Sequence, residues 1–333
     1  MGSRPLLPLM AAITTALTLS AHADPLTLRT TDTHPPDYPT VQALYYMSEH
    51  LARISDGRLN MKIYPGGQLG EEKDSLEITI FGGIDLNRVN LAPLNSIVPE
   101  TIVLGMPFIF ESIEHMRSVV DGPIGDDILA AMEPHGLIGL AFYDSGARSF
   151  YNVKRPIQTP ADLEGMKIRV QNSELFVEMV SALGANPTPM SFGEVYESLV
   201  LGTIDGSENN WPSYESTRHY EVAGFYTRTE HSMAPEVLVM SKHRWERLSD
   251  EDRRLIREAA RASVPVMRRL WDERVARSRE LVFENGNEVI EVVDKAPFRD
   301  AVRPVYDIFL TTPALRELAQ RILDSGSGGA PAS

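Results

Sequence analysis

The sequence predicts an α/β fold, and three observations lead to that prediction. Short apolar segments that suit β-strands alternate with segments whose apolar residues recur at helical spacing. Glycines stand where several of the helical segments should end, and two serine-headed capping boxes stand where others should begin. Such alternation is typical of α/β proteins with largely parallel sheets. With 333 residues, 43% of them hydrophobic, the chain can form one to three domains around a substantial core.

The first 23 residues have the order of a secretory signal peptide. Arg4 precedes an apolar run over residues 6–19, and Ala21-His22-Ala23 supplies the small residues of a cleavage site. A membrane anchor is the alternative, but the run is shorter than the roughly 20 residues that span a bilayer. We therefore expect the mature protein to begin near Asp24. Because an exported chain without cysteine must hold its fold by burial alone, a bacterial periplasm is the expected compartment.

The mature chain is expected to contain six strands and at least five helices. Strands are expected at residues 26–30, 59–63, 84–91, 137–142, 166–170 and 237–240. Helices are expected at residues 41–54, from 71 to the glycine pair 82–83, at 174–183, after the capping box Ser191/Glu194, and from Ser249 to Leu281. Pro265 should kink or divide the last of these helices. Residues 325–333, rich in glycine and serine, are expected to form a flexible tail.

Charge and missing motifs exclude several classes of function. The chain has 46 acidic and 32 basic side chains, a formal net charge of -14, which repels nucleic acids and anionic lipid surfaces. It has no HExxH motif, no cysteine ligand and no GxSxG elbow, and the glycine-rich stretch 66–70 lacks the lysine of a phosphate loop. The sequence therefore predicts no metal, no cofactor and no enzymatic activity.

Two arginines stand where an anion-binding site could form. Arg148 follows an expected strand and the turn 144–146, and Arg169 lies inside the apolar strand 166–170. Open α/β sheets bind ligands at strand ends and in the loops that follow. A guanidinium there offers a planar fork that matches a carboxylate. On spacing alone, the opposite reading of Arg169, a side chain that alternates outward to solvent, is equally supported.

The densest polar and aromatic patch covers residues 205–214. Its asparagines, Asn209 and Asn210, can both donate to and accept from the hydroxyls of a sugar-like ligand, and Trp211 could cover an apolar face. The same patch could be a hydrogen-bonded turn with Trp211 filling a core. The chemistry alone favours the turn.

Taken together, six segments in order resemble the DctP-type solute-binding proteins of tripartite ATP-independent periplasmic (TRAP) transporters. They are YPGGQLGE at 64–71, GID at 83–85, LGMPFIF at 104–110, DLEGMKIRV at 162–170, LGANPTPM at 183–190 and IDGSEN at 204–209. The resemblance implies a two-lobed periplasmic binding protein fold over residues 24–324, with a long helix that crosses both lobes and with lobes interleaved in sequence. It also implies closure on an organic anion and delivery of that anion to the transporter's membrane subunits.

The resemblance also assigns candidate binding residues. It places the main carboxylate salt bridge on Arg169, an assisting arginine on Arg148 and the asparagine of the DGxEN segment on Asn209. The resemblance also implies contacts from the loop after the first strand, at Thr33 or His34, and from four further residues: Glu72, Asn90, Glu236 and the aromatic Phe192.

The segment Asn210-Trp211-Pro212-Ser213-Tyr214 resembles the uronate-binding members, whereas many relatives have proline after Asn209. The expected ligand is therefore a hexuronate, such as D-glucuronate or D-galacturonate. Lactate, a C4-dicarboxylate or another sugar acid are alternatives within the same class. The rival from another class is a secreted hydrolase of uronate-containing sugars that would use carboxylates such as Glu72 and Glu208.

Overall fold

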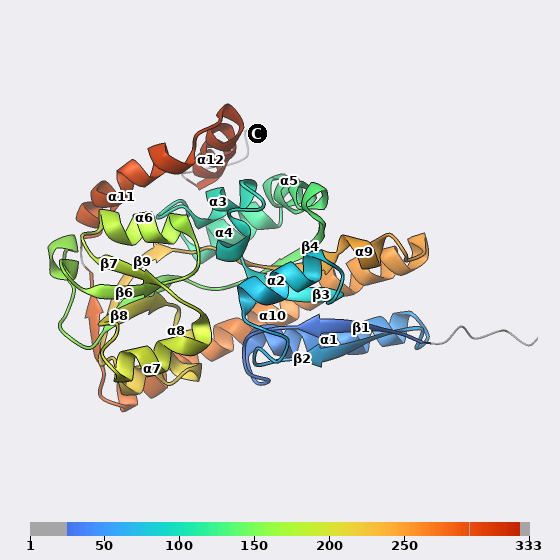
Figure 1. The fold of residues 1–333 in the computed structure, drawn as a ribbon, viewed down its shortest axis with the longest axis horizontal. Coiled ribbons are helices and arrows are strands. Elements are labelled where there is room, and N and C mark those ends of the chain that lie inside the picture. The colour runs from blue at the N-terminus through green and yellow to red at the C-terminus, as the bar shows by residue number, and fades with distance from the viewer. Residues whose placement is uncertain (1–24, 293, 327–333) are drawn as a thin grey trace, which may run out of the picture.

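Two β-sheets divide the protein into two lobes, and the chain passes between them more than once (Figure 1). The computed structural model describes residues 25–292 and 294–326. The sheet of the first lobe has the strand order β2-β1-β3-β10-β4, and that of the second lobe has the order β11-β9-β5-β8-β6-β7. The α/β prediction is confirmed. The predicted signal peptide lies outside the described residues.

The strands are β1 Leu26–Thr31, β2 Leu59–Tyr64, β3 Leu86–Asn90, β4 Leu137–Tyr143, β5 Arg148–Asn152, β6 Lys167–Val170, β7 Asn186–Pro189, β8 Gly206–Asn209, β9 Phe225–Ser232, β10 Glu236–Ser241 and β11 Glu288–Glu291. The α-helices are α1 Pro39–Ile54, α2 Glu72–Ile80, α3 Glu100–Gly105, α4 Ile113–Val120, α5 Pro123–Ala131, α6 Glu174–Ala182, α7 Val195–Val200, α8 Trp211–Ser216, α9 Lys242–Trp245, α10 Asp250–Glu284, α11 Ala296–Phe309 and α12 Pro313–Gly326. All six expected strands are present, with ends that differ by a few residues.

The sheets are largely parallel, as expected, but each contains one antiparallel strand. In the first lobe β1 runs parallel to β2 and β3, but β10 lies antiparallel between β3 and β4. In the second lobe β5 lies antiparallel between β8 and β9. Both β5 and β10 enter their sheet directly from the other lobe, through residues 144–147 and 233–235. An antiparallel neighbour needs no crossover helix, so the strand–helix alternation in the sequence does not reveal that these two strands run in the opposite direction.

One long helix, α10, spans both lobes. It packs against α1 and β4 of the first lobe and against α8 of the second, as Figure 1 shows in orange. Its start is as expected, because the Ser249 hydroxyl accepts a hydrogen bond from the Asp252 backbone N–H. Pro265 does not divide it, since all 35 residues remain helical. None of the helices in the described part of the chain is long and apolar enough to cross a membrane.

The polar and aromatic patch at 205–214 is a strand followed by a helix, so the turn interpretation is wrong. Residues 206–209 pair with β5 and β6 as β8, and α8 begins at Trp211. Trp211 does fill a core, with its ring stacked on that of Tyr226 at a centroid distance of 3.9 Å. At the other end of the chain, α12 runs to Gly326, so the first two residues of the predicted tail are helical. Residues 327–333 lie outside the described part.

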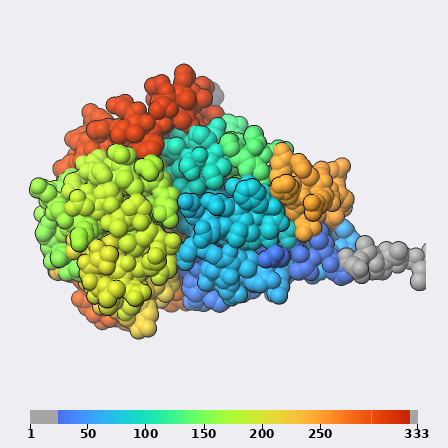
Figure 2. All heavy atoms as spheres, viewed as in Figure 1, coloured from blue at the N-terminus to red at the C-terminus, as the bar shows by residue number. Residues whose placement is uncertain are grey.

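The lobes meet closely on the face shown in Figure 2. The first-lobe residues drawn in blue and the second-lobe residues drawn in yellow-green abut along a seam. A cavity is lined by residues of both lobes. The structure therefore presents the two lobes in a closed arrangement.

Candidate functional site

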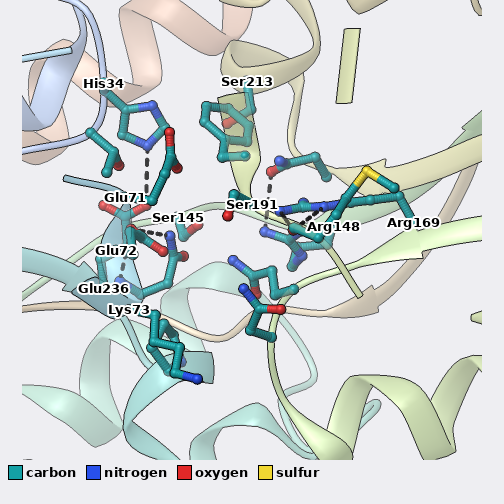
Figure 3. A pocket seen from close by; sticks show the side chains of 18 of the residues that line it. His34, Glu71, Glu72, Lys73, Ser145, Arg148, Arg169, Ser191, Ser213 and Glu236 are labelled. Atoms are coloured by element: carbon teal, nitrogen blue, oxygen red, sulfur yellow. Dashed lines mark hydrogen bonds and ion pairs between the residues drawn. The ribbon is translucent and has the colours of Figure 1, made fainter. Parts of the chain in front are cut away.

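The cavity between the lobes brings together all the residues that the family resemblance assigned to binding, and Asn210 with them, but not Trp211 (Figure 3). It contains about 520 Å³ of space free of protein atoms, part of it open to solvent. The proposed residues that line it are His34, Glu72, Asn90, Arg148, Arg169, Phe192, Asn209, Asn210 and Glu236. Thr33, the alternative to His34, lines it as well. Their roles in binding remain a prediction.

Strand ends explain why residues so distant in sequence meet here. Asn90 ends β3 and Glu236 begins β10, and the antiparallel register places the two opposite each other. In the second lobe, Arg148 begins β5 and Asn209 ends β8, which is paired with β5 through Ser149. Carboxyl ends of strands, and amino ends of their antiparallel neighbours, share one edge of a sheet. The two sheets turn these edges toward the same cavity.

Arg148 is buried and already paired within the protein. Its Nε and Nη2 donate to the two carboxylate oxygens of Glu208 at 2.5 and 2.8 Å, and Nη1 donates to Asn209 Oδ1 at 3.1 Å. Burial opposes the charge, but Glu208 outweighs it and raises the pKa of Arg148. Glu208 is equally buried, yet Arg148 lowers its pKa to about 2. The pair is a fixed ionic unit with one Nη1 hydrogen left for a ligand.

Arg169 is buried without an anionic partner. Only 3% of the residue is exposed, and its Nε and Nη2 donate to the Met190 carbonyl at 3.1 and 2.8 Å. No carboxylate of the described residues lies within 4.0 Å of its guanidinium. Burial, with the charge of Arg148 adding to it, lowers the pKa of Arg169. Alternation along β6 therefore turns this side chain into the cavity and not to solvent, with three N–H groups free for an anion.

The opposite wall of the cavity is acidic and is organised by Arg88. This arginine is fully buried, and it forms ion pairs with Asp32, with Glu72 (2.9 Å) and with Glu236 (3.4 Å). Burial alone would lower its pKa, but the three carboxylates raise it well above the usual value. We call Arg88 with Asp32, Glu72 and Glu236 the acidic group. One positive and three negative charges give it a formal charge of −2.

Within the acidic group, several oxygens remain open to a hydroxyl donor. Glu72 Oε1 accepts from Arg88, from the Asn90 backbone and from Asn90 Nδ2, which leaves Oε2 without a donor among the described residues. Glu236 Oε2 is buried and makes no hydrogen bond within that same part of the chain. Buried polar atoms are normally satisfied, so Glu236 Oε2, whose nearest cation is Arg88 at 3.4 Å, indicates a missing hydrogen-bond donor.

His34 and Phe192 close the site from opposite lobes. The His34 ring stacks on Tyr38 at 3.8 Å between centroids and meets the edge of Phe192 at 5.3 Å. His34 Nε2 lies 3.8 Å from Glu236 Oε1, and its Nδ1 is buried without a partner among the described residues. These rings supply an apolar surface beside the polar groups.

Asn209 and Asn210 differ in which of their side-chain polar atoms are already hydrogen-bonded within the protein. Asn209 Oδ1 accepts from Arg148 and from the Asn210 backbone, so its Nδ2 group is the part available to a ligand. Asn210 caps α8, because its Oδ1 accepts from the Ser213 backbone, while its Nδ2 donates to Ser145. Asn210 thus shapes the cavity wall with an amide that is largely occupied.

Contacts between the lobes surround the cavity. The Tyr38 hydroxyl lies 2.9 Å from the Ser213 hydroxyl across the seam. Glu71 of the first lobe receives hydrogen bonds from the backbone N–H groups of Phe192 and Gly193 in the second. Burial and the nearby Glu72 nevertheless raise the pKa of Glu71.

A further contact between lobes comes from the long helix. Arg274 of α10, only 5% exposed, pairs with Asp37 of the first lobe at 2.9 Å and with Glu215 of the second at 2.6 Å. Together with the contacts across the cavity, this bridge holds the closed arrangement.

Charge is therefore separated across the cavity, as Figure 3 shows with the arginines on one side and the glutamates on the other. The second-lobe wall, with Arg148, Arg169 and Glu208, has a formal charge of +1, against −2 for the acidic group. Such a cavity suits a ligand with one carboxylate at one end and hydroxyl donors at the other.

Comparison with known proteins places the chain in a family. The family model of the bacterial extracellular solute-binding proteins, family 7 (DctP), matches residues 30–312. The chain belongs to this family. The family resemblance drawn from the six segments is thereby confirmed, and the DctP family consists of solute-binding receptors.

Solved structures of similar DctP-type proteins contain sugar acids. A TRAP periplasmic solute-binding protein from Bradyrhizobium sp. BTAi1, in complex with α/β-D-galacturonate, is 56% identical with a TM-score of 0.89, covering 90% of this chain and 100% of that one. One from Roseobacter denitrificans, with bound β-D-glucuronate, is 44% identical with a TM-score of 0.87, covering 89% and 99%. A solute-binding protein of Chromohalobacter salexigens is 42% identical over 95% of this chain and 94% of its own.

Sequence reasoning missed two residues that organise this DctP-family site. Arg88 lies in the strand Leu86–Asn90, between Asn87 and Val89. The signal that singled out Arg169, an arginine inside a strand, applied equally to Arg88. Asp32, its partner, lies in the polar loop after the first strand, where the side chain accepts from the His34 backbone and from Thr40.

Proposed function

We propose that this protein is the periplasmic solute receptor of a TRAP transporter, that it captures a hexuronate between its lobes, and that it delivers the hexuronate to the membrane subunits. The observation that carries the proposal is the unpaired, buried guanidinium of Arg169 facing the acidic group across the cavity. A buried cation without a partner is costly, and a ligand carboxylate removes that cost. The galacturonate and glucuronate bound in similar proteins support the same ligand class.

The binding mode follows from the two walls. The hexuronate carboxylate would accept from Arg169 and from the remaining Nη1 hydrogen of Arg148. The sugar hydroxyls would donate to the free oxygens of Glu72 and Glu236, and the amide of Asn209 would donate to a ring or hydroxyl oxygen. Because this ligand contacts both walls, it binds the closed form better than an open one, and that difference drives closure.

Binding without turnover is part of the proposal. The hydrolase alternative needs two carboxyl groups across a scissile bond, one of them protonated as an acid. Glu208 is fully buried, bound to Arg148, and its pKa is lowered to about 2, so it stays ionised at neutral pH. Glu72 is engaged in the acidic group, where its Oε1 pairs with Arg88 at 2.9 Å.

A ligand screen tests the proposal. Purified mature protein would be melted with D-galacturonate, D-glucuronate, lactate, succinate and D-gluconate, and the leading ligands titrated by calorimetry. A hexuronate at one hundred times its Kd should stabilise the fold by about 2.7 kcal/mol. Stabilisation by lactate or succinate with no response to either hexuronate would overturn the assignment. NMR of the incubated sugar, and of an oligouronide, should show no product.

A further inference from the structure

The acidic group is more than a set of hydroxyl acceptors, because its charge is not balanced. Arg88 is its only buried cation, against three buried or nearly buried carboxylates. At the rim, Glu71 adds one negative charge and the exposed Lys73 one positive charge, so the formal sum stays at −2. The opposite wall has a formal charge of +1, which one ligand carboxylate neutralises.

From this imbalance we propose that the site selects for a single carboxylate and excludes sugar diacids, with Glu72 as the specificity-determining residue. The inference rests on the proposed hexuronate function and deepens it. An aldarate differs from a hexuronate by a second carboxylate at the far end of the chain. That carboxylate would face Glu72 and Glu236, whose free oxygens can accept a hydrogen bond but cannot donate one while ionised.

Glu72 is the residue whose charge can be removed with least disturbance. Its Oε1 accepts from Arg88 and Asn90, a role that the carbonyl oxygen of glutamine can keep, and its side chain is 14% exposed. Glutamine would place an NH2 group where the free Oε2 now lies, and that group can donate to a second carboxylate. One unit charge about 6 Å away, at an effective dielectric constant of about 20, changes affinity about a hundredfold.

The test compares D-galacturonate with galactarate, using calorimetry and competition at pH 7. In the wild-type protein, galactarate should bind at least about a hundredfold more weakly than galacturonate. In Glu72→Gln, the ratio of the galactarate Kd to the galacturonate Kd should be at least tenfold smaller than in the wild type. Glu49→Gln, which removes one charge from an exposed position on α1, should leave the ratio unchanged.

Each outcome decides the inference. Galactarate binding within tenfold of galacturonate in the wild type would overturn it. An unchanged ratio in Glu72→Gln would also overturn it, because discrimination would then come from the ring form of the sugar and not from charge. If Glu72→Gln misfolds, Glu236→Gln provides the same removal of one charge. A wild-type protein that binds no hexuronate at all would instead refute the proposed function, so the two failures are distinguishable.

Discussion

Replacement of Arg169 by methionine should separate ligand binding from protein stability. Methionine fills much of the same volume and removes the unpaired charge, together with the three N–H groups that face the cavity. A hexuronate carboxylate would then be buried without its main partner. Truncating one side of such a pair costs about 2–5 kcal/mol, or about thirtyfold to several-thousandfold in Kd.

In the ligand-free protein, Arg169→Met and the matched variant Arg148→Met should have different effects on the free energy of unfolding. Arg169 has no carboxylate partner, so Arg169→Met should leave the free energy of unfolding unchanged or raise it. Arg148→Met would strand the buried carboxylate of Glu208, and breaking a buried pair of this kind costs about 3–5 kcal/mol.

Calorimetry with galacturonate and urea unfolding without ligand measure the two effects. Unchanged galacturonate affinity in Arg169→Met would refute the assignment of the carboxylate site. A loss of stability in Arg169→Met as large as that in Arg148→Met would refute the claim that Arg169 is unpaired.

Three further predictions concern closure, the lobe connection and pH. Arg274→Met removes the bridge between the lobes, so hexuronate affinity should fall about tenfold. The prediction is contradicted if hexuronate affinity is unchanged and small-angle scattering of the liganded protein gives an unchanged radius of gyration. Gly146→Ala should lower the free energy of unfolding by about 1–3 kcal/mol, because φ is 62° and a Cβ would lie 3.1 Å from Trp271 Nε1; Gly165→Ala, with φ 76° and no atom within 4 Å, is the control and should cost less. Burial, with the nearby charge of Arg169, lowers the pKa of His219 to about 3, so between that pH and about 6.5 the unfolded chain binds a proton that the folded protein does not. The free energy of unfolding should therefore fall by up to about 1.4 kcal/mol per pH unit as pH decreases through this window. Urea unfolding at a series of pH values should show a weaker dependence of this free energy on pH in His219→Gln.

Much of the candidate site could be predicted because its residue types carry their chemistry in sequence. Arg169 stood inside an apolar strand, which marks a charged side chain that needs an explanation. Its partners could not be assigned from spacing, because spacing does not show whether an arginine in a strand faces a cavity or solvent. The decision came from the family resemblance, and the structure agrees by turning Arg169 into the cavity with 3% of its surface exposed.

The errors have a common physical cause. The antiparallel strand of each sheet and the strand β8 both depend on pairing between segments far apart in the chain, such as Ser149 with Asn209 and Asn90 with Glu236. Local periodicity reports which face of a segment is apolar, but it does not report which strand lies beside it. Arg88 was missed for the same reason, because its three carboxylate partners come from three separate segments.

The sequence by itself determined the α/β class, the alternation of elements and the family, because these depend on residue order and local spacing. Only the tertiary structure decided that Arg148 is neutralised by Glu208 while Arg169 is not, and that a group with a formal charge of −2 faces them. Coulomb interactions and desolvation depend on distances of a few ångströms between residues that the chain separates widely. The separation of charge across the cavity is therefore a property of the folded protein.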